Sequence, residues 1–271
     1  MKKIRFWYVC LPIFLCLVTA VKGQPLSTER IQLKVLSYNI HHCNPPSKGA
    51  LIDIEAIAEV IRKSGADLVA LQEVDVNTIR SGKGNNQARL LAEKTGMNYY
   101  FSKAIDYEGG DYGVAILSRY SIQDSMRLDL PIHANLPEET RTLAAVTVSV
   151  APGRQVIFAS THLGLKAANR RLQVENILSH FKPFDKEVIL AADFNATPDS
   201  EEMKMLYPFF SPSCRENCDF TIPVQRPNRK IDYILHSPVN AFNILETYTI
   251  DEQYASDHLP VFTLFEMIGN L

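Results

Sequence analysis

Six short segments of the chain place acids, amides or histidines directly after an apolar run. They read SYNIHH, LVALQEVD, ASTHLG, ILAADFNATP, KIDYILHS and YASDHLPVF. Each one alone has an ordinary explanation, because a carboxylate after a strand often caps a helix or a turn. Six of them together are harder to explain in this way, since converging acids repel one another unless a cation or a phosphate offsets their charge. The pattern therefore indicates chemistry on a phosphate or with a metal.

Other chemistries find less support in the sequence. There is no Ser-His-Asp order with a nucleophile elbow and no glycine-rich loop of the kind that holds phosphates. Cys214 and Cys218 are four residues apart in SPSCRENCD, which favours a local disulfide in an oxidising compartment. Zinc is less favoured, because the usual two-residue spacing and a nearby histidine are missing. Cys43 is left over.

The elements that must position these segments are mostly strands. Apolar runs predict strands at residues 33–40, 67–74, 99–102, 112–118, 127–130, 141–150, 155–161, 187–192, 231–236, 241–248 and 259–265. Helical periodicity predicts helices at residues 52–61, 87–94 and 169–181. Strand-rich halves that each have a helical cover predict an α/β (α+β) fold with two stacked, mainly antiparallel sheets and flanking helices.

The N-terminus has the features of a secretory signal peptide. Residues 1–23 combine a basic start, an apolar run from about Phe6 to Ala20 and small residues near Gly23. A membrane anchor is the alternative, but the run is shorter than the roughly 20 residues that span a bilayer. We expect cleavage, no transmembrane segment after it, and a periplasmic or secreted protein of residues 24–271.

Removal of residues 1–23 would leave an acidic protein. It takes away four basic residues and no acidic ones, which leaves 24 Lys and Arg against 30 Asp and Glu. Proteins that bind long polyanions usually carry a basic excess, so nucleic acid is a less favoured partner than a small molecule. Because no linker, low-complexity tract or repeat interrupts residues 24–271, we expect one domain, and we expect a monomer.

Three of the motifs resemble those of the endonuclease/exonuclease/phosphatase superfamily. They are LQEVD at residues 71–75, DFNATP at 193–198 and SDHLPV at 256–261, and the flanking YGVAILSRYSI and EETRT are similar to the family too. The resemblance covers the whole mature chain in order. This superfamily includes pancreatic deoxyribonuclease, abasic-site endonucleases, neutral sphingomyelinases and inositol polyphosphate 5-phosphatases.

The resemblance implies a four-layered α/β/β/α sandwich and a divalent metal. Glu73 matches the family's principal carboxylate ligand of Mg²⁺ or Mn²⁺. Asn39 and Asp257 match residues close to the metal and to the scissile phosphate. Oxygen ligands suit such ions, and a metal at a phosphoryl oxygen neutralises charge that develops in the transition state.

The resemblance also implies roles for the other residues of the site. Asp193 and Asn195 match the pair that orients or deprotonates the attacking water. His258 matches a histidine that binds or protonates the phosphate, Asp232 its carboxylate partner, and His162 a second histidine of the deoxyribonuclease and sphingomyelinase branches. Two further residues, Tyr112 and Arg141, are candidates for phosphate contacts, with a structural role as the alternative.

Five other polar residues near these motifs are not expected to take part in catalysis. His41 and His42 are expected to pack in a loop. Arg80, Lys83 and Arg89 are expected to form a solvated basic face, with a grip on a second anionic group as the alternative.

The sequence thus predicts an exported phosphoesterase that uses Mg²⁺ or Mn²⁺ and activated water on a phosphodiester or phosphomonoester. A small-molecule or lipid-headgroup substrate is favoured. The alternatives are a secreted deoxyribonuclease-like endonuclease and a binding module that has lost catalysis.

Overall fold

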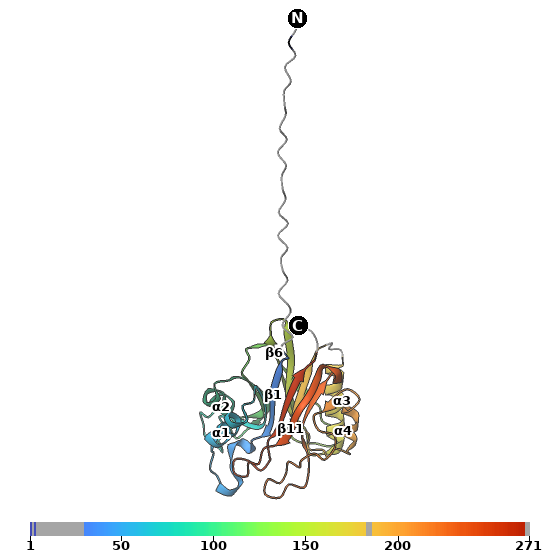
Figure 1. The fold of residues 1–271 in the computed structure, drawn as a ribbon. Helices are drawn as coiled ribbons and strands as arrows, with labels where there is room; N and C mark the ends of the chain where they lie inside the picture. The colour runs from blue at the N-terminus through green and yellow to red at the C-terminus, as the bar shows by residue number, and fades with distance from the viewer. Residues whose placement is uncertain (2, 4–29, 183–185, 269–271) are drawn as a thin grey trace.

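Two six-stranded sheets stacked face to face form the centre of the protein in the computed structural model, which describes residues 1, 3, 30–182 and 186–268 (Figure 1). The predicted signal peptide lies outside these ranges, apart from Met1 and Lys3. No helix in the described ranges is long and apolar enough to cross a membrane.

Each sheet is mixed, with one parallel pair of strands. The first sheet has the order β11 (Phe242–Thr249), β12 (Val261–Met267), β1 (Gln32–Asn39), β2 (Leu68–Val76), β4 (Gly110–Ser118) and β3 (Asn98–Tyr107). The second has the order β5 (Ile122–Leu130), β6 (Arg141–Ala151), β7 (Arg154–His162), β8 (Val188–Asp193), β10 (Asp232–Ser237) and β9 (Ser211–Pro212). β1 and β2 are parallel, as are β7 and β8, and the other neighbours are antiparallel.

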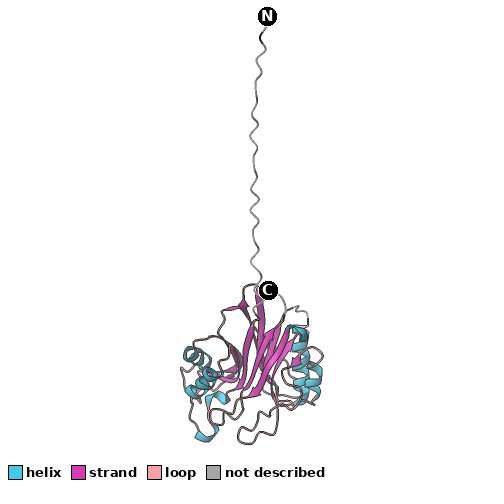
Figure 2. Cartoon of the chain, viewed as in Figure 1, coloured by secondary structure: helices cyan, strands magenta, loops and turns pink. Residues whose placement is uncertain are grey.

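Helices cover both outer faces of the stacked sheets (Figure 2). Helices α1 (Ile54–Ser64) and α2 (Gln87–Thr95) pack on the first sheet, and α3 (Ala167–Phe181) and α4 (Glu201–Leu206) pack on the second. Short 3₁₀ helices occur at η1 (His41–Cys43), η2 (Pro46–Lys48) and η3 (Val239–Ala241). A third apolar layer, with Phe158 and Phe265 among its members, fills the space between the sheets. The predicted four-layered α/β/β/α sandwich is confirmed.

Local signals in the sequence fix the ends of the first two helices. The Asp53 carboxylate accepts the Ala56 N–H at 3.0 Å, and the Asn86 side chain accepts the Arg89 N–H at 2.9 Å. Such side-chain caps satisfy backbone donors that the first helical turn leaves free. Gly65 and Gly96 end the helices in the left-handed conformation, at φ +63° and +66°, which glycine adopts without strain.

Helix α4 and strand β9 were not predicted, and the strands predicted at residues 99–102 and 127–130 are shorter than β3 and β5. Six residues are too few for helix α4 to display a periodic apolar face, and β9 has only two residues. β3 and β5 have half-exposed or exposed residues along much of their length and lack a continuous apolar run. The predicted disulfide between Cys214 and Cys218 is present, and Cys43 is a buried free thiol.

Candidate active site

The topology brings the predicted site residues of the second sheet to one edge. His162 is the last residue of β7 and Asp193 the last residue of β8, and the parallel register places them opposite each other. Asp232 begins β10, which runs antiparallel to β8, so it also lies opposite Asp193. Arg141 begins β6, the antiparallel neighbour of β7.

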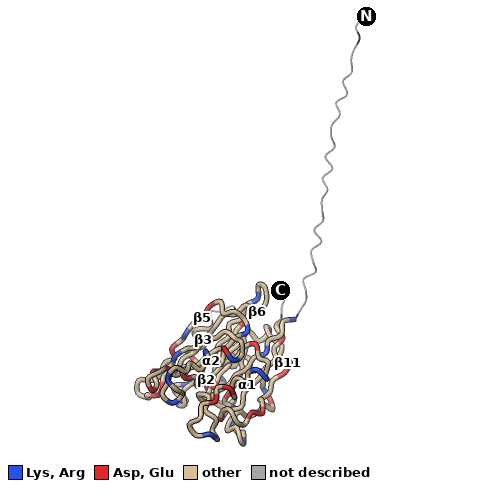
Figure 3. The backbone as a smooth tube through the Cα atoms, turned by 90° about the vertical axis from the view of Figure 1, so that its left-hand side faces the viewer, with Lys and Arg blue, Asp and Glu red and all other residues tan. Residues whose placement is uncertain are grey.

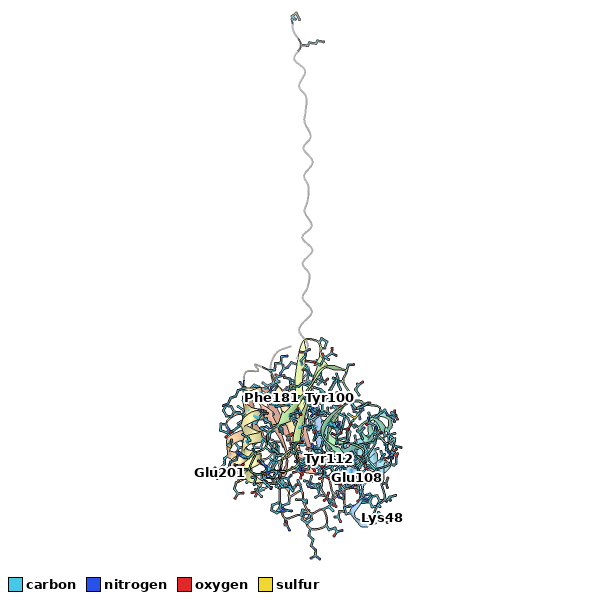
Figure 4. The ribbon with its side chains drawn as sticks, turned by 180° about the vertical axis from the view of Figure 1, so that it is seen from behind. Lys48, Tyr100, Glu108, Tyr112, Phe181 and Glu201 are labelled. Carbon is cyan, nitrogen blue, oxygen red and sulfur yellow. A yellow bond between two sulfur atoms is a disulfide. The ribbon has the colours of Figure 1, made fainter. Side chains whose placement is uncertain are left out.

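The first sheet contributes its residues at the same edge. Asn39 ends β1, and Asp257 and His258 lie just before β12, the antiparallel neighbour of β1. Tyr112, which Figure 4 labels, lies near the start of β4 and pairs with Asp75 near the end of β2. Strand ends of both sheets therefore supply one cluster of polar side chains.

Glu73 occupies an unusual backbone position. The pairing of β2 with β4 shifts register between Leu71 and Val74, and Glu73 within this bulge has φ +57°. A positive φ is strained for a residue with a long side chain, and bulges often redirect a side chain next to a functional site. The bulge aims the half-buried Glu73 carboxylate at Asn39.

Asn39 links the two sheets through its side-chain amide. Its Nδ2 donates to Glu73 Oε1 at 3.0 Å and to Asp193 Oδ2 at 3.1 Å. Its Oδ1 accepts the backbone N–H of His41 at 3.1 Å, and its backbone carbonyl accepts the Ser256 hydroxyl at 2.7 Å. In this geometry Asn39 orients two carboxylates, and its own side-chain oxygen is already bonded.

His258 forms the predicted pair with Asp232. Its Nδ1 lies 2.9 Å from Asp232 Oδ2, and its Nε2 lies 3.8 Å from Asp193 Oδ2. Burial alone would lower the pKa of His258, but Asp232, Asp193 and Asp257 together raise it to about 10. The imidazole is therefore held as a cation at neutral pH, the form that contacts an anion favourably.

Asp193 is suited to accept a proton at neutral pH. Burial, followed by the nearby charge of Asp232, raises the pKa of Asp193 to about 7, although hydrogen bonds from Asn195 and Asn39 oppose the rise. The backbone N–H of Asn195 donates to Asp193 Oδ1 at 2.8 Å. A general base works best when its pKa lies near the working pH.

His162 is neutral, in contrast to His258. Burial is the main reason why the pKa of His162 lies well below its ordinary value, and the positive charges of Arg141 and His258 lower it further. Asn195 Nδ2 lies 3.0 Å from His162 Nε2 and donates to the Leu163 carbonyl at 2.9 Å. An amide nitrogen is a donor only, so Nε2 accepts and the ring proton resides on Nδ1.

Tyr112 and Arg141 border the cluster beside His162. Both are buried, and the Arg141 guanidinium forms an ion pair with Glu139 at 2.7 Å and a hydrogen bond with the Tyr112 hydroxyl. Arg141 Nε is buried and has no hydrogen-bond partner among the described residues. Burial and the charge of Glu73 raise the pKa of Tyr112, so its hydroxyl stays protonated and can donate a hydrogen bond.

The donor set fits a hard divalent cation. Ligand atoms of Asp193, Asp232 and His258 lie within 4.8 Å of one another, and because the His258 ring is a cation, the two carboxylates are the metal donors of this group. Asp232 Oδ1 is buried and has no hydrogen-bond partner among the described residues. Glu73, bound to the same amide as Asp193, adds a carboxylate to this group, and carboxylate oxygens suit Mg²⁺ and Mn²⁺.

Several residues near the site differ from their expected roles or were not singled out. Arg80 does not lie on a solvated face, because its guanidinium makes a two-point contact, at 2.8 and 2.9 Å, with the fully buried carboxylate of Asp75. It also lies over the rings of Tyr107 and Tyr112. Asp75 and Ser256 stand inside the motifs LQEVD and SDHLPV, so the motifs themselves were the signal that could have identified them.

Comparisons with known proteins agree with this architecture. The chain is 25% identical over 252 residues to the uncharacterized protein YbhP of Escherichia coli K12, covering 88% of this chain and 97% of that protein. An endonuclease/exonuclease/phosphatase structure from Beutenbergia cavernae superposes with a TM-score of 0.73 at 24% identity, over 89% of this chain and 73% of that one. A mannosyl-6-phosphatase from Bacteroides thetaiotaomicron gives a TM-score of 0.66 at 18% identity, over 88% and 100%.

A family model described as Endonuclease/Exonuclease/phosphatase family matches residues 36–258. This range contains every residue of the candidate site. The chain belongs to the endonuclease/exonuclease/phosphatase family.

Proposed function

We propose that this protein is an exported, Mg²⁺- or Mn²⁺-dependent phosphoesterase that hydrolyses a small or lipid-derived phosphoester with activated water. The observation that carries the proposal is that Asp193, at the end of β8 in the second sheet, lies next to two polar groups of the first sheet. Asn39 donates to it from the first sheet, and His258 Nε2 lies 3.8 Å away. Export is inferred from the sequence of residues 1–23.

The charge and protonation state of each residue suit it to one role in the proposed hydrolysis. Glu73 and Asp257 would hold the metal, with Asn39 orienting Glu73, and the metal when bound would neutralise charge on the phosphoryl oxygens. Asp193, with its pKa near 7, would take a proton from the attacking water that Asn195 positions. Cationic His258, held by Asp232, would bind the phosphate or protonate the leaving oxygen. Arg141 and Tyr112 would donate to the phosphate.

A small substrate is favoured over a long polyanion on electrostatic grounds. The mature chain would have 24 basic and 30 acidic residues, and basic and acidic positions are interspersed on the side shown in Figure 3. A protein that binds duplex nucleic acid usually neutralises several phosphates at once with lysine and arginine. The mannosyl-6-phosphatase of the same fold has a small phosphoester named as its substrate.

A secreted nuclease is the second candidate, and His162 is the observation that favours it. By its place in the sequence, His162 matches a histidine of the deoxyribonuclease branch. Its Nε2 lies 3.5 Å from Asp193 Oδ2. Comparing kcat/KM on duplex DNA with that on bis(p-nitrophenyl) phosphate separates the candidates. A preference for DNA would overturn the small-substrate proposal.

The test of the activity is hydrolysis of bis(p-nitrophenyl) phosphate by the mature chain. EDTA should abolish hydrolysis, and added Mg²⁺ or Mn²⁺ should restore it. His258→Ala and Asp193→Ala should each lower kcat by about 10² to 10⁴, as expected for positioned acid–base groups. The control is Asp124→Ala, an exposed carboxylate of β5, which should leave kcat unchanged.

Two results would contradict the proposal. Full activity of both site variants would place the catalytic residues elsewhere. A folded wild-type protein that binds phosphoesters and metal without hydrolysing any of a panel of phosphomonoesters and phosphodiesters would favour the alternative of a binding module.

A further inference from the structure

A cavity of about 270 Å³ lies on the helix-covered side of the second sheet, beside the candidate active site. Its walls include the rings of Tyr207 and Tyr233, the side chains of Arg215 and Lys230, and the disulfide between Cys214 and Cys218. Tyr207 follows directly after α4, whose first residue, Glu201, is labelled in Figure 4. None of the residues considered for catalysis lines this cavity.

Lys230 is the unusual member of this wall. The residue is only 7% exposed, yet its ammonium group makes no hydrogen bond and no ion pair with any residue in the described ranges. Its ammonium lies over the Tyr233 ring, 4.9 Å from the ring centroid, and burial lowers its pKa, although the carboxylates of Asp232 and Asp219 are close enough to raise the pKa to a smaller extent. An ammonium group has three hydrogen-bond donors. Lys230 therefore lines the cavity with an ammonium group whose donors form no hydrogen bond with the residues that the structure describes.

Arg215 adds a second positive charge. One guanidinium nitrogen donates to Ser211 Oγ at 2.7 Å, and the other nitrogens have no hydrogen bond within the part of the chain that the structure describes. The described side chains that line the cavity thus include two cations and no carboxylate. Guanidinium and ammonium groups are the usual partners of phosphate.

The two tyrosines give the cavity apolar walls. The Tyr207 hydroxyl is occupied by the Pro198 carbonyl at 3.1 Å. The Tyr233 hydroxyl lies 2.9 Å from the Ala196 carbonyl and 3.0 Å from the Lys230 carbonyl. With their hydroxyls bonded to the protein, both tyrosines offer mainly ring surface to a ligand, which suits the flat or apolar body of a small molecule.

The same hydrogen bonds join the cavity to the candidate active site. Tyr233 holds together the turn that contains Asn195 and Ala196 and the segment before Asp232. Lys230 is two residues from Asp232, so their Cα atoms are at most about 7 Å apart. The cavity wall and the candidate site are thus neighbours, joined through Tyr233 and residues 230–232.

We infer that this cavity binds a second, non-reacting phosphate group of the substrate, held by Lys230 and Arg215. The assignment of this group to the substrate rests on the proposed phosphoesterase function, whereas phosphate binding by the cavity does not. The inference specifies the substrate class further: the substrate carries a phosphate besides the one that is hydrolysed.

The binding test uses phenyl phosphate as the probe, in EDTA, with calorimetry on the mature chain. Lys230→Met should weaken binding at least tenfold and Arg215→Gln several-fold, whereas Lys230→Arg should retain most of the affinity. The matched control is Lys204→Met, which removes an exposed lysine of α4 that pairs with Glu201. It should bind as the wild type does.

Unchanged affinity in Lys230→Met and Arg215→Gln, or no binding by the wild type, would overturn the inference. Thermal unfolding of each variant shows whether it is folded. If Lys230→Met does not fold, Arg215→Gln decides, because Arg215 is exposed and its loss leaves the core intact.

A kinetic test separates this inference from the proposed activity. For a phosphodiester that also carries a terminal phosphate, Lys230→Met should raise KM about tenfold with kcat unchanged, the pattern of a lost binding contact. For bis(p-nitrophenyl) phosphate, which has no second phosphate, KM should not change. Equal KM changes for both substrates would overturn the inference, whereas failure of the wild type to hydrolyse either would contradict only the proposed activity.

Discussion

Two histidines on either side of one carboxylate carry opposite protonation states. His162 lies 3.5 Å and His258 lies 3.8 Å from Asp193 Oδ2. His258 has Asp232 as a partner and a pKa raised to about 10, whereas burial lowers the pKa of His162. One ring is therefore a cation and the other an acceptor at the same pH. A difference of this kind is produced by neighbours, not by residue type.

The titration of Asp193 can be measured directly. In chelator-treated protein, NMR of its carboxyl carbon should show a midpoint near pH 7. Asn39→Ala should move this midpoint upward, because the variant removes a hydrogen bond that favours the charged form. A midpoint near pH 4 in the wild type would contradict the environment described for this group.

The bridging amide of Asn39 should matter for both activity and metal affinity. Asn39→Ala leaves the carboxylates of Glu73 and Asp193 without their common donor, so we expect kcat to fall by roughly 10- to 100-fold, the typical cost of losing an outer-shell partner. The Mg²⁺ concentration for half-maximal rate should rise as well. The matched control is Asn44→Ala, whose amide binds the Gly49 and Leu51 carbonyls in the loop after β1. Unchanged metal dependence in Asn39→Ala would contradict the bridging role.

At the scale of elements, β2 does more than supply Glu73. Its residue Asp75 is fully buried and accepts hydrogen bonds from Thr78, Arg80 and Ser81. Burial opposes ionisation, but these partners, Arg80 foremost, hold the pKa of Asp75 below its ordinary value. The carboxylate thereby fixes the loop after β2 beside Tyr112.

Substitution of Asp75 should destabilise the protein strongly. Asp75→Ala leaves the half-buried Arg80 and two hydroxyl groups without their acceptor, and breaking a buried ion pair in this way costs about 3–5 kcal/mol. Chemical denaturation measures the loss. Asp106→Ala removes an exposed partner of Lys103 and should leave the free energy of unfolding nearly unchanged, because exposed ion pairs are screened by water. Equal effects of the two substitutions would show that Asp75 does not anchor the loop.

Most elements could be predicted because their residues repeat with the period of a strand or a helix. β8 and β10 are almost wholly buried and were predicted with starts within one residue, as was α2 with its Asn86 cap. The edge strand β3 was predicted only over residues 99–102, and helix α4 was not predicted at all, since an exposed edge or a six-residue helix leaves little apolar pattern. The bulge at Glu73 also left no trace in LQEVD, because it arises from pairing with β4.

At the scale of the whole molecule, stability depends on the layer between the sheets. His236 is buried next to the rings of Phe242 and Phe265, at centroid distances of 5.6 and 5.4 Å. Burial, followed by the charge of Arg215, lowers the pKa of His236 to about 4. The folded protein therefore keeps this ring neutral where the unfolded chain protonates it.

This histidine predicts a loss of stability in mild acid. The unfolded chain binds a proton at His236 below about pH 6.5 and the folded chain only below about pH 4, so stability is complete above pH 6.5 and falls between these values. The loss should reach about 2–3 kcal/mol, since one pKa unit corresponds to about 1.4 kcal/mol. His236→Phe should abolish this part of the pH dependence in denaturation experiments at pH 7 and pH 4.5.

His133→Gln serves as the control for acid sensitivity, because His133 lies in the loop after β5 and outside the layer between the sheets. This variant should lose stability in acid as the wild type does. If His236→Phe behaved in the same way, the acid sensitivity would have another source.

The sequence by itself determined the layered fold, the family motifs and the identity of the polar residues at strand ends, because periodicity and motif spacing are properties of the chain. Only the tertiary structure decided which of these groups touch. The position of Asn39 between Glu73 and Asp193, the different protonation states of His162 and His258, and the cavity at Lys230 each depend on atoms from distant segments. Protonation and hydrogen bonding follow from distance and burial, which the linear order of residues does not contain.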